Sequence, residues 1–261
     1  MPDSTPPTII AFANQKGGVG KSTTTINLAA ALVASGERVI IIDGDPQANA
    51  TSGLGIDRRG IETSIYHVIL GMAELDDIIL KTSTPGLMVA PSSIDLAAVE
   101  LELVSRMSRE RQLAVAFEQM KTPTDFVFID CPPSLGLITV NALTAADEVI
   151  IPIQAEYYAL EGLTQLLRSI EAIQSNLNPK LEIEGAIITM YDRRTTLAAE
   201  VTEQVREHFG EKAYQTVIPR SVRLAEAPSF GEPIETFDPT STGAQAYRSL
   251  AEEFRRRHGR T

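Results

Sequence analysis

The feature that most constrains this fold is a glycine-rich loop at residues 14–23, with the sequence Asn-Gln-Lys-Gly-Gly-Val-Gly-Lys-Ser-Thr. An apolar run at residues 8–13 precedes the loop, and an apolar helical pattern at residues 22–34 follows it. A strand, a glycine loop and a helix in that order bring the N-terminus of the helix to the loop. Free N–H groups and the helix dipole favour an anion there. The sequence therefore predicts a phosphate-binding loop within an α/β fold.

This loop contains two lysines, although one is enough for a bound nucleotide. The usual phosphate-loop pattern G-x-x-x-x-G-K-[ST] requires glycine at position 15, where this chain has Gln15. Lys21 is placed to reach the terminal phosphates, and Ser22 is placed to ligate Mg²⁺. Lys16 is surplus to a single nucleotide, and one interpretation is that it serves a phosphate held by another subunit. The alternative, a glycine-rich turn with no ligand, leaves both lysines unexplained.

Apolar segments alternate with helical patterns along the chain. We expect strands at residues 8–13, 38–43, 87–90, 126–130, 148–153 and 183–189, and a short one at 216–218. Helical patterns cover residues 22–34, 97–119, 160–175, 197–209 and 242–257. This alternation predicts a doubly wound, mostly parallel sheet with helices on both faces. We expect a flexible N-terminal tail at residues 1–8 and a single phosphate-loop domain at residues 9–258.

Two of the expected strands end in aspartates, at the edge where open α/β sheets bind their ligands. Asp130 follows four apolar residues, a pattern typical of a Walker B strand, and we expect it to hold Mg²⁺ opposite Ser22. Asp43 and Asp45 are two positions apart, so in an extended segment they point to the same side. We expect Asp45 to orient an attacking water and Asp43 to lie near Mg²⁺. The alternatives are ordinary strand-end acids and, for Asp45-Pro46, turn chemistry.

Composition excludes several classes of function. No apolar run approaches the roughly 20 residues that span a bilayer, and the polar, proline-rich N-terminus has no signal-peptide apolar segment. Cys131 is the only cysteine, which rules out an internal disulfide or a four-thiolate iron–sulfur cluster within one chain. The net charge of −11 argues against nucleic acid, yet residues 189–261 carry 11 basic and 11 acidic side chains. A basic patch in that neutral part is compatible with the overall charge.

Taken together, these motifs resemble the ParA/MinD superfamily of ATPases with a deviant Walker A loop, and within it the chromosomal ParA (Soj) partitioning proteins. The matching segments are residues 13–21, 43–47, 130–134, 152–156, 189–192 and 218–229. The resemblance extends from about Ile9 to Phe254, and its last segment is the most specific. The chain departs from the family at Ala48, where glycine is common, and at Gly44, where a larger apolar residue is common. Both departures lie near Asp45.

The resemblance implies an ATP-dependent sandwich homodimer in which Lys16 reaches the nucleotide of the partner subunit. Gly17 would then lie where the two subunits approach closely. The implied site takes ATP and Mg²⁺ as cofactors. Its nucleotide-binding residues would be Lys16, Gly17, Gly18, Val19, Gly20, Lys21, Ser22, Thr23, Met190, Pro219 and Ser221, the last three around the adenine and ribose. Lys16, Lys21 and Asp45 would be catalytic, and Ser22, Asp43 and Asp130 would lie around the metal.

The resemblance also implies a cytoplasmic, nucleoid-associated switch for chromosome or plasmid partitioning. Its ATP-bound dimer would bind double-stranded DNA without sequence preference, and a ParB-type centromere-binding protein would stimulate hydrolysis of ATP to ADP and phosphate. Arg194 and Arg223 match the family's DNA-contacting arginines, and Arg193 and Arg220 are further candidates. Solvated surface arginines are the alternative for all four. We expect residues 255–257 to form the solvated face of a packed terminal helix.

Other functions remain open at this level. A ParA-like ATPase can position another cargo. A MinD-type membrane-associated division-site regulator needs a terminal amphipathic helix, and residues 255–261 contain no large apolar residue, so we expect no stable membrane binding. The single cysteine opposes a nitrogenase iron protein, and we expect no room for the glutaminase domain of a cobyrinate amidating enzyme. Because the loop begins at Lys16, we also expect no N-terminal helix-turn-helix domain and no direct sequence-specific operator binding.

Overall fold

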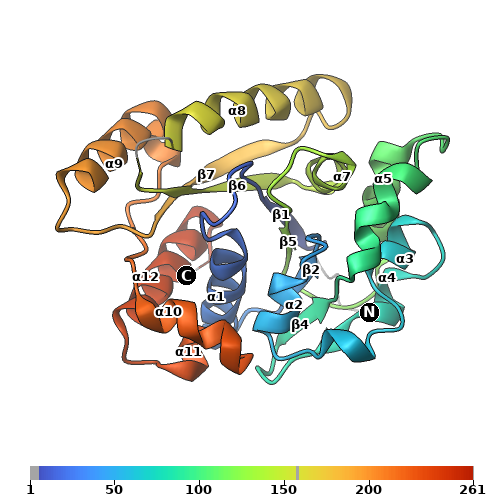
Figure 1. The fold of residues 1–261 in the computed structure, drawn as a ribbon, viewed down its shortest axis with the longest axis horizontal. Helices are drawn as coiled ribbons and strands as arrows, with labels where there is room; N and C mark the ends of the chain where they lie inside the picture. Colours follow the sequence, from blue (N-terminus) through green and yellow to red (C-terminus); the bar gives the residue numbers. More distant parts are fainter. Residues whose placement is uncertain (1–5, 157–158, 261) are drawn as a thin grey trace.

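The computed structural model describes residues 6–156 and 159–260, which form a seven-stranded sheet covered by helices on both faces (Figure 1). The strand order is β3-β4-β2-β5-β1-β6-β7, and every neighbouring pair is parallel except β3 with β4. The strands are β1 (Thr8–Phe12), β2 (Val39–Asp43), β3 (Leu80–Lys81), β4 (Leu87–Ala90), β5 (Phe126–Asp130), β6 (Glu148–Gln154) and β7 (Glu182–Thr189). This architecture confirms the predicted doubly wound, mostly parallel sheet. Residues 1–5 of the expected tail lie outside the described residues.

Helices pack on both sides of this sheet. They are α1 (Lys21–Ala34), α2 (Asn49–Gly53), α3 (Ile65–Ile69), α4 (Leu75–Ile78), α5 (Val99–Glu102), α6 (Gln112–Gln119), α7 (Leu137–Ala145), α8 (Ala159–Asn176), α9 (Thr196–Phe209), α10 (Val222–Glu226), α11 (Ile234–Phe237) and α12 (Thr242–Arg257). In Figure 1, α1 and α12 lie on one side of the sheet and α7 and α8 on the other. Within the described part of the chain, no helix has the length and apolar character needed to cross a bilayer.

The sheet separates two aliphatic cores. Successive residues of a strand point to opposite faces, so Ile10 and Phe12 of β1 contact the core beneath α1 and α12. Ala11 and Ala13 face the other core, under α7 and α8. Cys131 is buried in that second core.

The register of the three central strands determines where a ligand can bind. Asp43 of β2 is the neighbour of Asp130 in β5, and Asp130 is in turn the neighbour of Phe12 in β1. The loop that follows Phe12 therefore begins beside both aspartates. From β1 the chain crosses through α1 to β2 on one side, while β6 lies on the other side, and such divergence opens a crevice at the carboxyl edge.

The prediction of a single helix at residues 97–119 is wrong. The segment divides into a 3₁₀ turn at Ile94–Ala98, α5, a second 3₁₀ turn at Arg109–Arg111 and α6, and Ser108 adopts a left-handed φ of 54°. Leu101 and Met107, which contributed to the apolar pattern, are 79% and 89% exposed. The pattern therefore did not mark one continuous buried face.

The strand expected at residues 216–218 is also wrong. Only two isolated bridges occur in this region, between Ala186 and Ala213 and between Tyr191 and Pro219. The backbone N–H groups of Gln215 and Thr216 instead donate to the carboxylate of Glu253 in α12, at 2.8 and 2.9 Å. A side chain distant in the sequence thus takes the donors that a strand would have used.

The C-terminal arginines differ from the expected solvated face. Arg255 pairs with Glu37 at 3.3 Å, and Arg257 pairs with Glu253 at 3.2 Å while its guanidinium lies 3.8 Å from the ring centre of Tyr214. Only Arg256 of the three is exposed. Arg255 and Arg257 therefore attach α12 to the rest of the domain.

His258 provides a pH-dependent attachment of the same helix. Its ring nitrogens lie 2.9 Å from the Glu148 carboxylate and 2.9 Å from the Phe254 carbonyl oxygen, and its side chain is 10% exposed. Burial lowers the pKa of His258, but the hydrogen bonds to Glu148 and Phe254 outweigh burial and raise that pKa above its ordinary value. The protonated ring is therefore the form that stabilises the fold.

We predict that His258→Gln reduces the free energy of unfolding more at pH 6 than at pH 9, with a difference of roughly 1 kcal/mol. The raised folded pKa means that the contribution is complete below the unfolded pKa of about 6.5 and disappears as pH rises through the folded pKa. Urea denaturation at both pH values measures it. Arg256→Gln, on an exposed position of the same helix, is the control, and equal losses at both pH values for His258→Gln would contradict the assignment.

Candidate functional site

The loop between β1 and α1 presents a row of backbone donors. Toward acceptors on the described residues, the N–H groups of residues 17–23 make no hydrogen bond, and the first helical bond runs from Thr24 N to Gly20 O at 2.8 Å. Gly18 and Gly20 have φ angles of +74° and +83°, which favour glycine. Consecutive unpaired N–H groups at a helix N-terminus form an anion-binding concavity.

Side-chain hydrogen bonds hold this loop in place. Asn14 donates to the carbonyl of Pro152 at 2.7 Å and accepts from the N–H of Lys16 at 3.0 Å. The hydroxyl of Thr189, the last residue of β7, donates to the carbonyl of Val19 at 2.8 Å. The ends of β6 and β7 thus fix the loop before any ligand binds, which lowers the entropic cost of binding.

Lys21 points into the space enclosed by the loop. The residue is 6% exposed, and its ammonium group donates to the carbonyl oxygen of Lys16 at 3.2 Å. Burial lowers the pKa of Lys21, and the nearby carboxylates of Asp130 and Asp45 oppose that effect. The ammonium group is therefore close to negative charge but is not paired with it.

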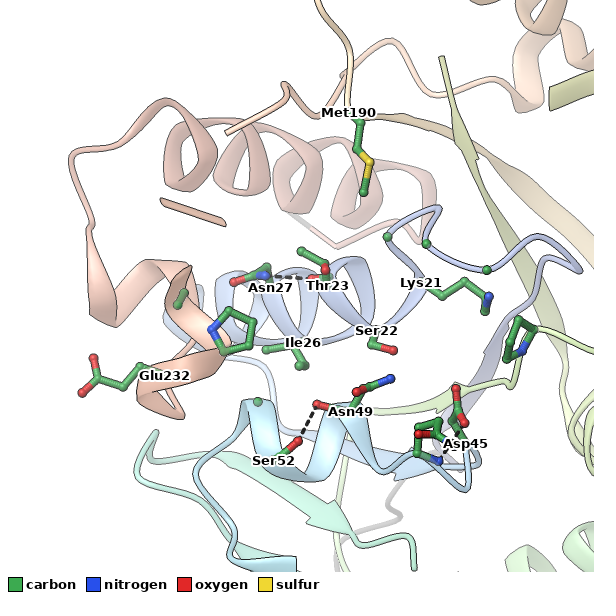
Figure 2. A pocket seen from close by; sticks show the side chains of 18 residues that line it. Lys21, Ser22, Thr23, Ile26, Asn27, Asp45, Asn49, Ser52, Met190 and Glu232 are labelled. Atoms are coloured by element: carbon green, nitrogen blue, oxygen red, sulfur yellow. Dashed lines mark hydrogen bonds between the residues drawn. The ribbon is translucent and has the colours of Figure 1, made fainter. Parts of the chain in front are cut away.

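A cavity of about 400 Å³ adjoins the loop, between α1 and α2 (Figure 2). Most of the predicted nucleotide-binding residues line it, namely Gly17, Gly18, Gly20, Lys21, Ser22, Thr23 and Met190. Asp45, predicted to be catalytic, lines it as well. Sequence reasoning missed other lining residues, including Asn49 and Ser52 of α2 and Pro133. Helix α2 spans only five residues, which is too short for a helical period that could have placed its polar side chains here.

A second cavity, of about 260 Å³, opens from the same loop toward the C-terminal part of the chain. Met190, Pro219 and Ser221, the residues predicted around the base and ribose, all line it. Tyr247 of α12 also lines it and was not predicted; its hydroxyl lies 3.3 Å from that of Thr24 in α1. A groove with apolar walls next to the phosphate loop suits a planar base.

Asp130 is a buried carboxylate with an incomplete environment. Neither of its oxygens has a hydrogen-bond partner of ordinary geometry among the described residues, although the Ser22 hydroxyl lies near enough to lower its pKa. Burial and the neighbouring Asp43 outweigh Ser22 and Lys21 and raise the pKa of Asp130 to about 8. An unpaired buried carboxylate is costly. A divalent cation between Asp130 and Ser22 would remove that cost, because hard cations prefer oxygen ligands.

Asp43, by contrast, has its oxygens occupied. One accepts from the N–H and hydroxyl of Thr51 at 2.7 and 2.6 Å, and the other accepts from the N–H of Asp45 at 3.2 Å. Burial, as the largest cause, raises the pKa of Asp43 to about 6. These contacts attach α2 and Asp45 to the end of β2. Its predicted place near a metal stays a prediction, and the structure adds an anchoring role that sequence reasoning missed.

Asp45 lines the larger cavity with 6% of its surface exposed, and one of its oxygens accepts from the N–H of Gln47 at 2.9 Å. The two departures from the family pattern flank it. A Cβ at Gly44 would lie 2.9 Å from the carbonyl oxygen of Asp130, so this glycine permits a close approach of the two strand ends. Ala48 has a left-handed φ of 53°, which is uncommon for a residue with a side chain.

Lys16 is not among the residues that line the two cavities, although its carbonyl oxygen accepts from Lys21. Its side chain is 38% exposed and turns toward Glu156, with 3.3 Å between the ammonium nitrogen and a carboxylate oxygen. The two lysines of the loop therefore point in different directions, Lys21 inward and Lys16 outward.

The four predicted DNA-binding arginines lie on exposed positions, but most are ion-paired. Arg194 is 82% exposed and pairs with Asp192 at 2.7 Å, and this contact holds the pKa of Asp192 well below its usual range. Arg223 pairs with Glu226 and Asp238 at 2.9 and 2.8 Å, and Arg220 contacts Glu156 at 3.5 Å. Arg193 is exposed and pairs with no acid on the described residues.

Comparison with known proteins gives a consistent result. The model of a family described as "AAA domain" matches residues 7–183. The sporulation initiation inhibitor protein Soj of Bacillus subtilis is 54% identical over 245 residues, covering 94% of this chain and 97% of Soj. The chromosome partitioning protein ParA of Caulobacter vibrioides is 53% identical over 247 residues, covering 94% of this chain and 92% of ParA.

Among solved structures, cobyrinic acid a,c-diamide synthase from Mycobacterium smegmatis with bound ADP and magnesium superposes with a TM-score of 0.85. It is 38% identical, and the match covers 97% of this chain and 96% of that one. The two chains therefore have similar lengths, so the expected lack of room does not separate this chain from an enzyme of that name. Sequence identity is the better discriminator, and it is higher toward the partitioning proteins.

Proposed function

This chain belongs to the ParA/Soj family of chromosome-partitioning P-loop ATPases, and from that membership we propose that it is an ATP-dependent dimerising switch that binds DNA. Mg-ATP would join two copies, the dimer would bind double-stranded DNA without sequence preference, and a ParB-type partner would stimulate hydrolysis and release. The observation that carries the proposal is that Lys21 and Lys16 extend in different directions from one phosphate loop, Lys21 into the loop and Lys16 toward Glu156.

Nucleotide binding is supported by the chemistry of the loop. The unpaired N–H groups of residues 17–23 and the buried ammonium group of Lys21 supply donors and positive charge for phosphates. Asp130 and Ser22 would hold Mg²⁺, which when bound neutralises charge on the phosphate oxygens. The cavity lined by Met190, Pro219 and Ser221 would take the base and ribose.

Hydrolysis would depend on Asp45. This carboxylate borders the cavity that also contains Lys21 and Ser22, and the backbone N–H of Asp45 is held by Asp43. A positioned carboxylate can accept a hydrogen bond from a water and so orient it toward the terminal phosphate. Thr51 and Asp43 would act through Asp45 by fixing the segment that carries it.

Dimerisation is supported by Gly17, which nothing in its own subunit requires to be glycine. Its φ lies outside the left-handed region, and a Cβ there would meet only the Cβ of Pro133 at 3.9 Å, an ordinary contact. The residue is also exposed. A close approach by a second subunit would give this position a reason to lack a side chain.

We predict that Gly17→Val folds normally and binds ATP, with a free energy of unfolding within about 0.5 kcal/mol of the unmodified chain. It should remain a monomer with ATP and Mg²⁺ in sedimentation velocity. Gly20→Val is the matched control, because the φ of +83° at Gly20 makes a side chain strained, so that variant should lose nucleotide binding itself. A Gly17→Val chain that dimerises as the unmodified chain does would remove this support for the dimer.

DNA binding would use the exposed arginines on the C-terminal part. Contacts of arginine with phosphate give affinity that is independent of sequence and falls steeply with salt. Arg194 and Arg223 are paired with acids in the free subunit, so DNA phosphates would have to compete with Asp192, Glu226 and Asp238. Arg193 faces no such competitor among the described residues.

We predict that the double variant Arg194→Glu, Arg223→Glu weakens ATP-dependent DNA binding and reduces the slope of log K against log salt by about 4. Two phosphate contacts would be lost from each subunit of a dimer. Fluorescence anisotropy over a salt series measures both effects. The exposed pair Arg111→Glu, Lys121→Glu changes the net charge equally and is the control. Unchanged affinity and slope in the first variant would exclude this surface.

A ParA-like switch that positions a plasmid or another cargo would have the same site. A cobyrinate amidating function has one observation in its favour, the structural match at 38% identity. The relatives at 53% and 54% identity favour partitioning. The experiment is to measure ATPase rates alone, with DNA and with a ParB-type protein. Stimulation by DNA and by the ParB-type protein would support partitioning, because neither positioning of another cargo nor cobyrinate amidation requires both.

A further inference from the structure

Glu156, just beyond the end of β6, accepts from side chains of three separate segments. One of its oxygens lies 3.3 Å from the ammonium nitrogen of Lys16. The other accepts from the amide of Gln154 at 2.6 Å and lies 3.5 Å from the guanidinium of Arg220. The phosphate loop, the end of β6 and the predicted DNA-binding segment therefore meet at this one carboxylate.

Two of these donors orient the carboxylate toward the third. Gln154 is 8% exposed, so its amide is a fixed donor, and it is the last residue of β6, a strand paired on both sides, with β1 and β7. The backbone N–H of Arg220 donates to the Tyr191 carbonyl at 3.0 Å, which fixes the base of its side chain, although that side chain is 60% exposed. With one oxygen of Glu156 taken up by Gln154 and Arg220, the other remains for Lys16.

Lys16 is therefore held by an acid of its own subunit. The proposed function requires the same ammonium group to reach the nucleotide of a second subunit. The phosphates of that nucleotide would compete with Glu156 for Lys16. The more favourable of the two contacts would determine whether the lysine contacts its own subunit or the partner. An ion pair present only in the free subunit opposes assembly by the free energy needed to break it.

We infer that Glu156 is a positioning residue that holds Lys16 in the free subunit. It thereby raises the dissociation constant of the ATP-bound dimer, so that a higher protein concentration is needed for dimerisation. This inference rests on the proposed function. The Lys16 and Glu156 side chains are 38% and 45% exposed, so solvent screens this ion pair and its contribution is small. A two-fold dimer would break two such pairs, which amounts to about a two- to thirtyfold effect on the dimer dissociation constant.

The test compares Glu156→Gln with the unmodified residue in an Asp45→Ala background, in which hydrolysis should not deplete ATP. Sedimentation velocity over a concentration series with ATP and Mg²⁺ gives the dimer dissociation constant, which should fall two- to thirtyfold. Glu110→Gln is the matched control, because it removes one charge and one surface ion pair, with Arg109, and should leave dimerisation unchanged.

A second measurement examines the contact itself in the absence of nucleotide. The chain has six lysines, so reductive ¹³C-methylation gives few NMR signals, and Lys16→Arg assigns that of Lys16. The Lys16 signal should shift in Glu156→Gln and not in Glu110→Gln, a change that a purely structural role for Glu156 would not produce.

The outcomes separate the inference from the function on which it rests. Equal or weaker dimerisation of Glu156→Gln, or an unshifted Lys16 signal, overturns the role of Glu156 while leaving the switch intact. If the Asp45→Ala parent never dimerises with ATP, the proposed function fails, and the inferred role of Glu156 in dimerisation fails with it. Tighter dimerisation together with a shifted Lys16 signal supports the role.

Discussion

The site depends on two carboxylates that the sheet register brings side by side in a buried position. Asp43 and Asp130 are direct neighbours at the ends of β2 and β5, and burial raises the pKa of each, to about 6 and about 8. Their environments differ, because Thr51 and Asp45 satisfy Asp43 while Asp130 lacks a partner of ordinary geometry. One acid therefore fixes the local backbone, and the other leaves the site in need of a cation. Lys21 partly meets this need without closing an ion pair.

The same loop places its two lysine side chains in different environments. Lys21 lies at the start of α1, where the helix geometry turns its side chain into the loop. Lys16 precedes the glycines, and Asn14 holds its backbone so that its side chain extends outward to Glu156. Gly17 adds an exposed, unobstructed position between them. The loop therefore directs one lysine into the cavity and the other outward to the surface of the subunit, as the proposed dimer requires.

The sequence predicted the features that depend on local patterns. The phosphate loop and six strands of the sheet follow from short motifs, and helix α12 was placed at its observed bounds because its apolar period is regular. The three residues that the family resemblance implied around the base lie together in one cavity, and their role there stays a prediction. The failures involve distant partners. Glu253 accepts from the backbone N–H groups of residues 215 and 216. Arg255, which was expected on a solvated face, pairs with Glu37. The contacts of Glu156 and Thr51 also depend on tertiary packing, so no spacing could reveal them.

In the proposed dimer Lys16, and not only Lys21, makes ATP a dimer-forming ligand. The most direct measurement is sedimentation velocity of Lys16→Ala with ATP and Mg²⁺, combined with titration of a fluorescent ATP analogue into the monomer. Lys16→Ala should bind the analogue within about threefold of the unmodified chain, a small difference on the free-energy scale, and should remain monomeric. If Lys16→Ala dimerises with ATP as the unmodified chain does, Lys16 does not couple ATP to dimerisation.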